Sequence, residues 1–184
     1  MKIEPGDYGI FKLYDDGRLE AFGLRVVFFR IETRASIRAT ILDLLGKEGG
    51  SVVLRLVGER IGKNSGEFAK KNFGSALSKE LFDYISNIYL QSGRGKREFT
   101  IKDNEVIVKV YNSFEADAHL ISLGRADEPS CFFIQGYLKG LFSIFTGKEV
   151  DVEEVMCKAK GDPYCEFHVK FRFLIDSSSS RDAR

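Results

Sequence analysis

Over the first thirty residues, apolar and polar positions alternate in short runs, which is the pattern of β-strands. Residues 7–14 and 25–31 are predicted to be strands. The Asp15-Asp16-Gly17 segment that separates them is typical of a turn.

From Arg34 onward the apolar spacing becomes that of amphipathic helices, and three are predicted. The first ends before Gly49-Gly50, the second starts near Ser51 and reaches the low seventies, and the third spans residues 78–91. The residues expected on the three buried faces are, in order, Ile37, Ile41, Leu44 and Leu45; Val53, Leu54, Val57 and Ile61; and Leu81, Phe82, Ile85, Ile88 and Tyr89.

Glycine recurs every four residues in the second predicted helix, at Gly58, Gly62 and Gly66. Each glycine costs about 1 kcal/mol relative to alanine in a helix interior, so the row needs a reason. Either another element packs closely against the row, or the row is a smooth wall beside a bound ligand.

The second half of the chain predicts two hairpins with a helix between them. Residues 99–110 form the first hairpin, which turns at Asp103-Asn104. The helix covers residues 131–146, and the last hairpin pairs residues 150–159 with residues 164–173 around a turn at 160–163. The expected buried residues are Ile134, Leu138, Leu141 and Phe145 in the helix, and Cys165, Phe167, Val169, Phe171 and Phe173 in the last strand.

A basic, glycine-rich segment, residues 93–97, precedes the first of these hairpins. It could hold an anion, but it lacks the GxxxxGK[ST] spacing of a phosphate loop. A solvated loop is therefore the favoured interpretation.

Length and charge restrict the class of protein. The 184 residues suffice for one domain, and 28 Lys and Arg nearly balance 27 Asp and Glu, so the basic excess of a nucleic-acid-binding protein is missing. No apolar stretch reaches the roughly 18–20 residues of a membrane span, and the N-terminus has no signal-peptide core. We expect a cytoplasmic protein with neither a membrane span nor a nucleic-acid partner.

Three cysteines are an odd number for a disulfide framework, which raises the question of a metal. A turn centred on Gly161 places Cys157 opposite Cys165, with Cβ atoms about 4.5–5.5 Å apart, and this spacing suits two thiolates on one tetrahedral metal. Cys131, near a helix start, is a third candidate ligand. Three buried, inert cysteines are the alternative.

Two neighbouring acids compete for the fourth ligand position. Glu153 shares a face of a regular strand with Cys157, whereas Glu154 reaches the same metal only if the strand bulges or begins between them. Three thiolates would select zinc over magnesium or calcium, and four protein ligands would make the site structural.

Residues 136–169 resemble the signature of the 4-vinyl-reductase domain family, which has a glycine-bracketed helix, an acidic strand and then Cys-x-Ala-x-Gly-Asp-x-x-Cys-x-Phe. The residues at the fixed positions of this motif are Cys157, Ala159, Gly161, Asp162, Cys165 and Phe167. The strong match is confined to this segment.

The resemblance implies an α+β fold, a single domain in which an antiparallel sheet packs with helices, related to small subunits of the TRAPP trafficking complex. It implies an N-terminal β extension at residues 1–32, a ligand-binding domain at 33–175 and a disordered polar tail at 176–184. Members commonly form homodimers.

The resemblance also implies a site. In aromatic-sensing bacterial activators, this domain binds phenol-like or hydrocarbon effectors beside a zinc ion held by Cys, Glu, Cys and Cys. The spacing of those ligands matches Cys131, Glu154, Cys157 and Cys165, which favours Glu154 over Glu153 and predicts a structural zinc in the C-terminal hairpin.

One departure from the phenol sensors changes the expected ligand. Those sensors orient the effector hydroxyl with a His and a Trp, but this chain has no Trp, and His119 and His168 do not lie at the matching positions. We therefore expect a more purely apolar pocket, for which 16 Phe and 7 Tyr supply material. Its candidate lining residues, chosen by type and helical position, are Phe82, Tyr84, Ile88, Tyr137, Phe142 and Phe145.

The expected function is a sensor or carrier of a small apolar molecule that acts through a protein partner. One alternative is a dimeric assembly subunit or trafficking-type adaptor. The other is an enzyme or accessory protein in tetrapyrrole vinyl reduction, which is disfavoured because no GxGxxG, HExxH or nucleophile-elbow motif is present and His119 is a weak acid–base candidate.

Overall fold

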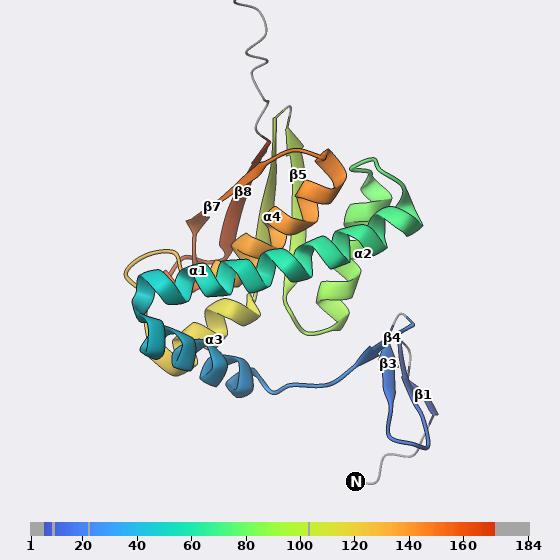
Figure 1. Ribbon diagram of the computed structural model, residues 1–184, viewed down its shortest axis with the longest axis horizontal. Helices are drawn as coiled ribbons and strands as arrows, with labels where there is room; N and C mark the ends of the chain where they lie inside the picture. Colours follow the sequence, from blue (N-terminus) through green and yellow to red (C-terminus); the bar gives the residue numbers. More distant parts are fainter. Residues whose placement is uncertain (1–5, 9, 22, 103, 172–184) are drawn as a thin grey trace, which may run out of the picture. The chain divides into compact units, whose positions relative to one another are not determined.

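The computed structural model describes the chain except for residues 1–5, 9, 22, 103 and 172–184. It separates into two compact units, residues 1–30 and 31–184. The two units are drawn together in Figure 1 and are described in turn.

The first unit is an antiparallel meander of four short strands in chain order. They are β1 (Gly6–Tyr8), β2 (Phe11–Leu13), β3 (Leu19–Ala21) and β4 (Leu24–Val26). The single strand expected at 7–14 is thus two strands, with Tyr8 pairing with Phe11.

The strand expected at 25–31 is too long. It ends at Val26, which pairs with Leu19, the first residue of β3. A longer strand would have to pair with Arg18, which instead belongs to the turn, where its backbone N–H donates to Asp16 Oδ1 at 3.0 Å. Residues 27–30 are therefore irregular, and Ile31 begins a helix.

The second unit packs four helices with a four-stranded sheet (Figure 1). The helices are α1 (Ile31–Phe73), α2 (Lys79–Gln91), α3 (Phe114–Leu123) and α4 (Phe132–Thr146); the strands are β5 (Lys96–Lys102), β6 (Glu105–Tyr111), β7 (Val150–Met156) and β8 (Cys165–Phe171), and a 3-10 turn, η1 (Lys158–Lys160), precedes β8. The strand order is β5-β6-β8-β7, and every neighbouring pair is antiparallel. The prediction of a mixed fold of helices and antiparallel sheet is confirmed.

Helix α1 changes direction at Gly46, whose φ of 66° and ψ of 172° are not helical. The break predicted at Gly49-Gly50 is wrong because both of these glycines are helical. The left-handed φ at Gly46 is a conformation that other residues rarely adopt.

The buried face expected for α1 is also largely wrong. Ile37, Leu44 and Leu45 are 48%, 77% and 52% exposed, and Val57 and Ile61 are exposed as well, so that Leu54 is the one fully buried member of the expected set. Small residues dominate the face that is buried, which consists of Ala35, Arg38, Gly50, Ser51, Leu54, Gly58, Gly62, Gly66 and Ala69.

The glycine row explains this inversion because α1 and α4 touch through their backbones. A Cβ atom on Gly58 would overlap the carbonyl oxygen of Phe133, and one on Gly62 would overlap that of Tyr137. On α4, Gly136 and Gly140 have the same relation to the carbonyl oxygens of α1. The row therefore serves close helix packing and is not a wall beside a ligand.

The other helices and hairpins follow the predictions more closely. Helix α2 is capped by the Ser78 hydroxyl, which accepts from Leu81 N at 3.3 Å, and Ile88 on its expected inner face is half-buried. In β8 the expected alternation holds through Val169, and Phe171 is half-buried. Asp103, Phe173 and the predicted tail at 176–184 lie outside the described residues.

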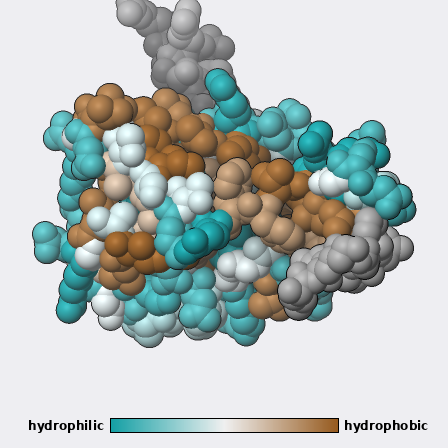
Figure 2. All heavy atoms as spheres, turned by 90° about the horizontal axis from the view of Figure 1, so that it is seen from below, coloured by the Kyte–Doolittle hydropathy of each residue, from teal (hydrophilic) through white to brown (hydrophobic). Residues whose placement is uncertain are grey.

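Within the described residues, no helix is long and apolar enough to cross a membrane. Apolar side chains are nevertheless common on the surface, as Figure 2 shows for one face. Much of this apolar surface belongs to α1, whose exposed large side chains are Ile37, Leu44, Leu45, Val52, Leu56, Val57, Ile61 and Phe68.

Candidate metal centre

Three separate segments bring four metal-binding side chains together. Cys131 directly precedes α4, Glu154 lies in β7, Cys157 follows β7, and Cys165 begins β8. All four are buried, and one ligand atom from each lies within 4.8 Å of the others.

A bulge in β7 turns Glu154 toward this cluster. Glu154 pairs with Phe167 and Met156 pairs with Glu166, so Val155 is an extra residue without a partner. Glu153, the competing candidate, stays on the other side, where its exposed carboxylate pairs with Lys170 at 3.0 Å. The structure thus brings together the four expected residues and keeps Glu153 apart from them.

The distances between the sulfur atoms fit a tetrahedral metal. The Cys131 Sγ lies 3.8 Å from the Cys157 Sγ and 3.7 Å from the Cys165 Sγ, and all three cysteines are free. Metal–sulfur bonds of about 2.3 Å at tetrahedral angles give sulfur–sulfur separations of about 3.8 Å.

The Glu154 carboxylate has one oxygen to spare. Its Oε2 accepts a hydrogen bond from Cys131 N at 2.7 Å, whereas its Oε1 is buried and has no hydrogen-bond partner in the described part of the chain. A buried acceptor without a partner costs free energy. A metal ion between the three sulfur atoms and this oxygen would remove that cost, so the residues present fit such an ion.

Polar groups around the cluster hold its members in place. Hydroxyls of Ser113 and Ser130 lie 3.8 Å from the sulfurs of Cys131 and Cys157, respectively, and Lys158 N donates to Cys165 Sγ at 3.3 Å. Contacts of this kind orient metal ligands and stabilise the thiolate form.

Without a cation, the four donors cannot all be ionised. Burial, followed by the charge of Cys157, raises the pKa of Glu154 to about 9, and burial raises the pKa of Cys131 well above its ordinary value. The pKa of Cys157 is lowered because Cys131 and Cys165 donate hydrogen bonds to it. The cluster alone therefore favours a single thiolate, and a divalent cation would allow the other donors to ionise.

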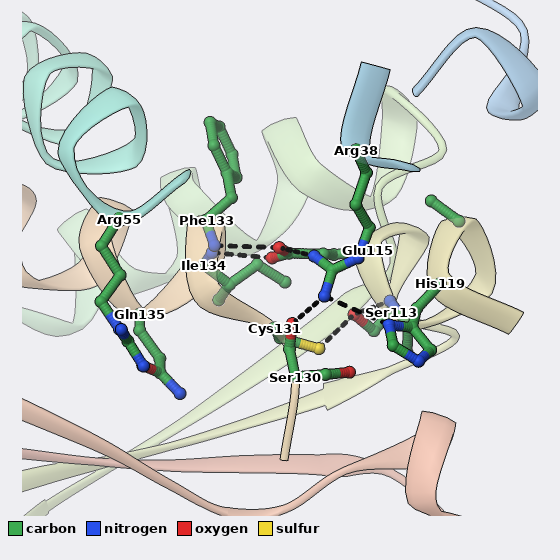
Figure 3. Close-up of polar contacts among 12 residues, drawn as sticks. Arg38, Arg55, Ser113, Glu115, His119, Ser130, Cys131, Phe133, Ile134 and Gln135 are labelled. Carbon is green, nitrogen blue, oxygen red and sulfur yellow. Dashed lines mark hydrogen bonds and ion pairs between the residues drawn. The ribbon is translucent and has the colours of Figure 1, made fainter. Parts of the chain in front are cut away.

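A second buried network joins the cluster to α1, α3 and α4 (Figure 3). Cys131 at the start of α4 provides no side-chain cap, and Glu115 of α3 replaces it by accepting from Phe133 N at 2.9 Å and Ile134 N at 2.8 Å. Arg38 of α1 pairs with Glu115 at 2.9 Å and donates to the Ser130 carbonyl at 2.6 Å.

Sequence reasoning missed this network together with helix α3. The missed signals for the helix are the Ser113 cap and the acidic residues Glu115 and Asp117 in its first turn. No local pattern marks the pair of Arg38 and Glu115, because 77 residues separate them.

Of the residues expected to contact a ligand, four lie in the main hydrophobic core: Phe82, Tyr137, Phe142 and Phe145. Tyr84 is partly buried at the edge of this core, and Ile88 is half-buried. The ring centroids of Phe82 and Phe142 are 6.3 Å apart, which brings α2 and α4 together.

A surface cavity of about 330 Å³ lies elsewhere, beside the network of Arg38. Its walls include His119, Ser130 and Phe132, and none of the six expected ligand residues lines it. His119 Nδ1 lies 3.2 Å from Arg38 Nη2 (Figure 3), which assigns it a structural contact in this wall.

The sequence matches known proteins over most of its length. Residues 107–171 match the family model of the vinyl-4-reductase domain. The transcriptional regulatory protein XylR of Pseudomonas putida is 27% identical over 157 residues, which make up 82% of this chain and 28% of XylR. The chain therefore spans less than a third of the length of that relative.

Two solved structures share the fold of this chain. The phenol-responsive sensory domain of the transcription activator PoxR, solved with phenol, aligns with a TM-score of 0.77 at 22% identity, covering 88% of this chain and 85% of that one. A vinyl-4-reductase family protein of Methanocaldococcus jannaschii aligns with a TM-score of 0.56 at 21% identity, covering 80% and 85%. The expected resemblance to the 4-vinyl-reductase family is confirmed, and the match to the domain of that family extends over residues 107–171.

Proposed function

We propose that this chain is a sensory or carrier module that binds a small apolar molecule in its aromatic core and holds a structural zinc ion at Cys131, Glu154, Cys157 and Cys165. The observation that carries the proposal is the position of α4. The buried cluster, with its unsatisfied Glu154 Oε1, lies at the start of the helix that contributes Tyr137, Phe142 and Phe145 to the core.

The comparisons favour sensing among the functions of this fold. PoxR is described as a phenol-responsive activator, and XylR is a transcriptional regulator. Because the chain spans only part of XylR, the output of the module would come from a partner or a further segment. The cytoplasm remains the expected location.

The chemistry of the donor set favours zinc. Three thiolates prefer zinc to the hard cations magnesium and calcium, and four protein ligands leave no open coordination position for a reaction. Bound zinc would fix α4 to β7 and β8. This closed geometry favours a structural role over the enzyme alternative.

A pair of neighbouring substitutions tests the metal proposal. Glu154→Gln is expected to reduce the zinc content of the purified protein, since it removes an anionic ligand, whereas the matched variant Glu153→Gln should retain one zinc per chain. Zinc content is measured by atomic emission. Equal zinc in both variants, or none in the wild type, would contradict the assigned ligand set.

The absence of tryptophan provides a test of the ligand site. Phe82→Trp places a single fluorophore in the proposed pocket, and its emission is expected to shift and saturate when toluene or a related apolar compound is added. Phe68→Trp, on the exposed side of α1, is the matched control and should not respond. No saturable response at Phe82→Trp across a series of apolar compounds would refute the ligand site.

We also propose that a second copy of the chain covers the exposed apolar residues of α1. A row of such side chains on one helix is unusual for a monomer and typical of a subunit interface. Leu56→Glu is expected to lower the molar mass measured by light scattering from dimer to monomer, whereas Lys71→Glu should leave it unchanged. A monomeric wild type would contradict the dimer.

The adaptor alternative shares this surface but predicts no exchangeable ligand. The response of Phe82→Trp therefore separates the two functions.

A further inference from the structure

The side chain of Arg97 is buried in the core without an acidic partner. It lies on β5 and is 2% exposed, and its Nε and Nη1 atoms make no hydrogen bond to any described residue. No carboxylate of the described residues forms an ion pair with it. The solvated loop expected at residues 93–97 is therefore wrong at its last residue.

Aromatic rings are the neighbours of this guanidinium. Its central carbon lies 3.3 Å from the ring centroid of Tyr89 and 5.3 Å from that of Tyr137. Such contacts stabilise a cation through the faces of the rings, but they supply no acceptor for its N–H groups. Two buried donors thus remain without an acceptor.

A comparison with Arg38 shows what is missing. Arg38 is equally buried, at 1% exposed, but it has Glu115 as its counterion and two further acceptors. An arginine stays protonated even when it is buried, and a buried charge normally requires an anionic partner. The partner of Arg97 is not in the described chain.

The position of Arg97 places it at the proposed ligand site. Tyr137, whose ring it approaches, is one of the six residues expected to contact the ligand. In the sheet, Arg97 pairs with Val110, and Val110 pairs with Cys165 of the metal cluster. The unpaired guanidinium therefore lies between the aromatic core and the metal centre.

We infer that the ligand of this module is an aromatic carboxylic acid, whose carboxylate accepts hydrogen bonds from Arg97 and whose ring packs among the core aromatic side chains. The inference rests on the proposed function and specifies its ligand class. A carboxylate suits the planar fork of a guanidinium, which can donate two parallel hydrogen bonds. Neutral aromatic compounds would leave the same donors unsatisfied.

The experiment compares 4-methylbenzoate with its neutral analogue 4-methylbenzamide by isothermal titration calorimetry on the zinc-loaded full chain. The wild type is expected to bind the acid at least tenfold more tightly than the amide. Arg97→Met should lose this preference, and Arg97→Lys should retain part of it. In the wild type, the Arg97 Nε–Hε resonance should shift on titration with the acid, which requires no variant.

Stability without ligand gives a second readout that a purely structural arginine would not produce. If Arg97 awaits an anion, Arg97→Met removes an uncompensated charge, and the ligand-free Tm should be equal to or higher than that of the wild type. Arg38→Met is the matched control and should lower Tm, because it leaves Glu115 buried without its cation.

The outcomes separate this inference from the proposed function. If neutral aromatic compounds bind as tightly as the acid, or if Arg97→Met retains the preference, the ligand class is wrong and the apolar site stands. If the Arg97→Met variant loses stability as Arg38→Met does, Arg97 is a structural residue and the inference fails. If neither compound binds, nor any other of the apolar series, the proposed function fails as well.

Discussion

Glu115 is a buried carboxylate with three partners, and each comes from a different part of the chain than its own helix. It accepts from two backbone N–H groups at the start of α4 and from Arg38 of α1. Burial raises its pKa, and the positive charges of Arg38 and Arg34 oppose that rise. This one side chain therefore joins three helices beside the metal cluster.

Glu115→Gln is expected to destabilise the protein by about 3 kcal/mol or more, because it leaves the buried Arg38 without its counterion. The free energy of unfolding is measured by urea denaturation. Asp83→Asn, which removes an exposed pair with Lys79, should change it by less than about 1 kcal/mol. Similar values for the two variants would mean that the buried network contributes little.

His119 is expected to make stability depend on pH. Burial, followed by the positive charge of Arg38, lowers its pKa in the folded state. The unfolded chain therefore binds the proton more readily, so the contribution of His119 is present above the ordinary pKa of 6.5 and is lost as pH falls through and below it.

The pH prediction is tested by comparing the wild type with His119→Gln, which can still accept from Arg38 but does not titrate. The wild type should lose more free energy of unfolding than the variant between about pH 7.5 and about pH 5.5, the range that spans the titration of histidine. Parallel curves for the two proteins would show that His119 does not contribute.

At the scale of elements, α1 shows where periodicity misleads. The apolar positions correctly indicate a helix, but the buried side is the one with glycine and alanine, because α4 approaches the backbone itself. Hydrophobic periodicity assumes that the largest side chains face the core. Where backbones touch, the smallest residues face inward and the large ones remain exposed.

Gly62→Ala tests this packing. Its Cβ would overlap the Tyr137 carbonyl oxygen, so the variant should be destabilised by about 1–3 kcal/mol despite the better helix propensity of alanine. Gly49→Ala, where the nearest atom is the Leu45 Cβ at 3.2 Å, is the control and should be neutral or slightly stabilising. Thermal unfolding measures both, and equal Tm values would contradict the close contact of α1 and α4.

The hairpins and helices α2 and α4 could be predicted because their signals are local. Ser78 caps α2, Gly147 ends α4 in the left-handed conformation, and β8 alternates regularly as far as Val169. The bulge that separates Glu154 from Glu153 could only be inferred as a requirement of the metal, since the sequence of β7 does not announce it.

At the scale of the whole molecule, the candidate site depends on contacts between distant segments. Cys157 and Cys165 share a hairpin, so their proximity follows from a turn, whereas Cys131 and Glu154 were selected through a family resemblance. The network of Arg38 and Glu115 and the isolated Arg97 could not be predicted, because each is defined by what packs around it in three dimensions.

The most direct test of the account is a native mass spectrum of the protein purified without added metal or chelator. We predict a mass excess of one zinc ion per chain, together with a small organic adduct that is lost when the protein is denatured. A folded protein whose mass equals that of the bare chain would contradict both the metal centre and the bound ligand.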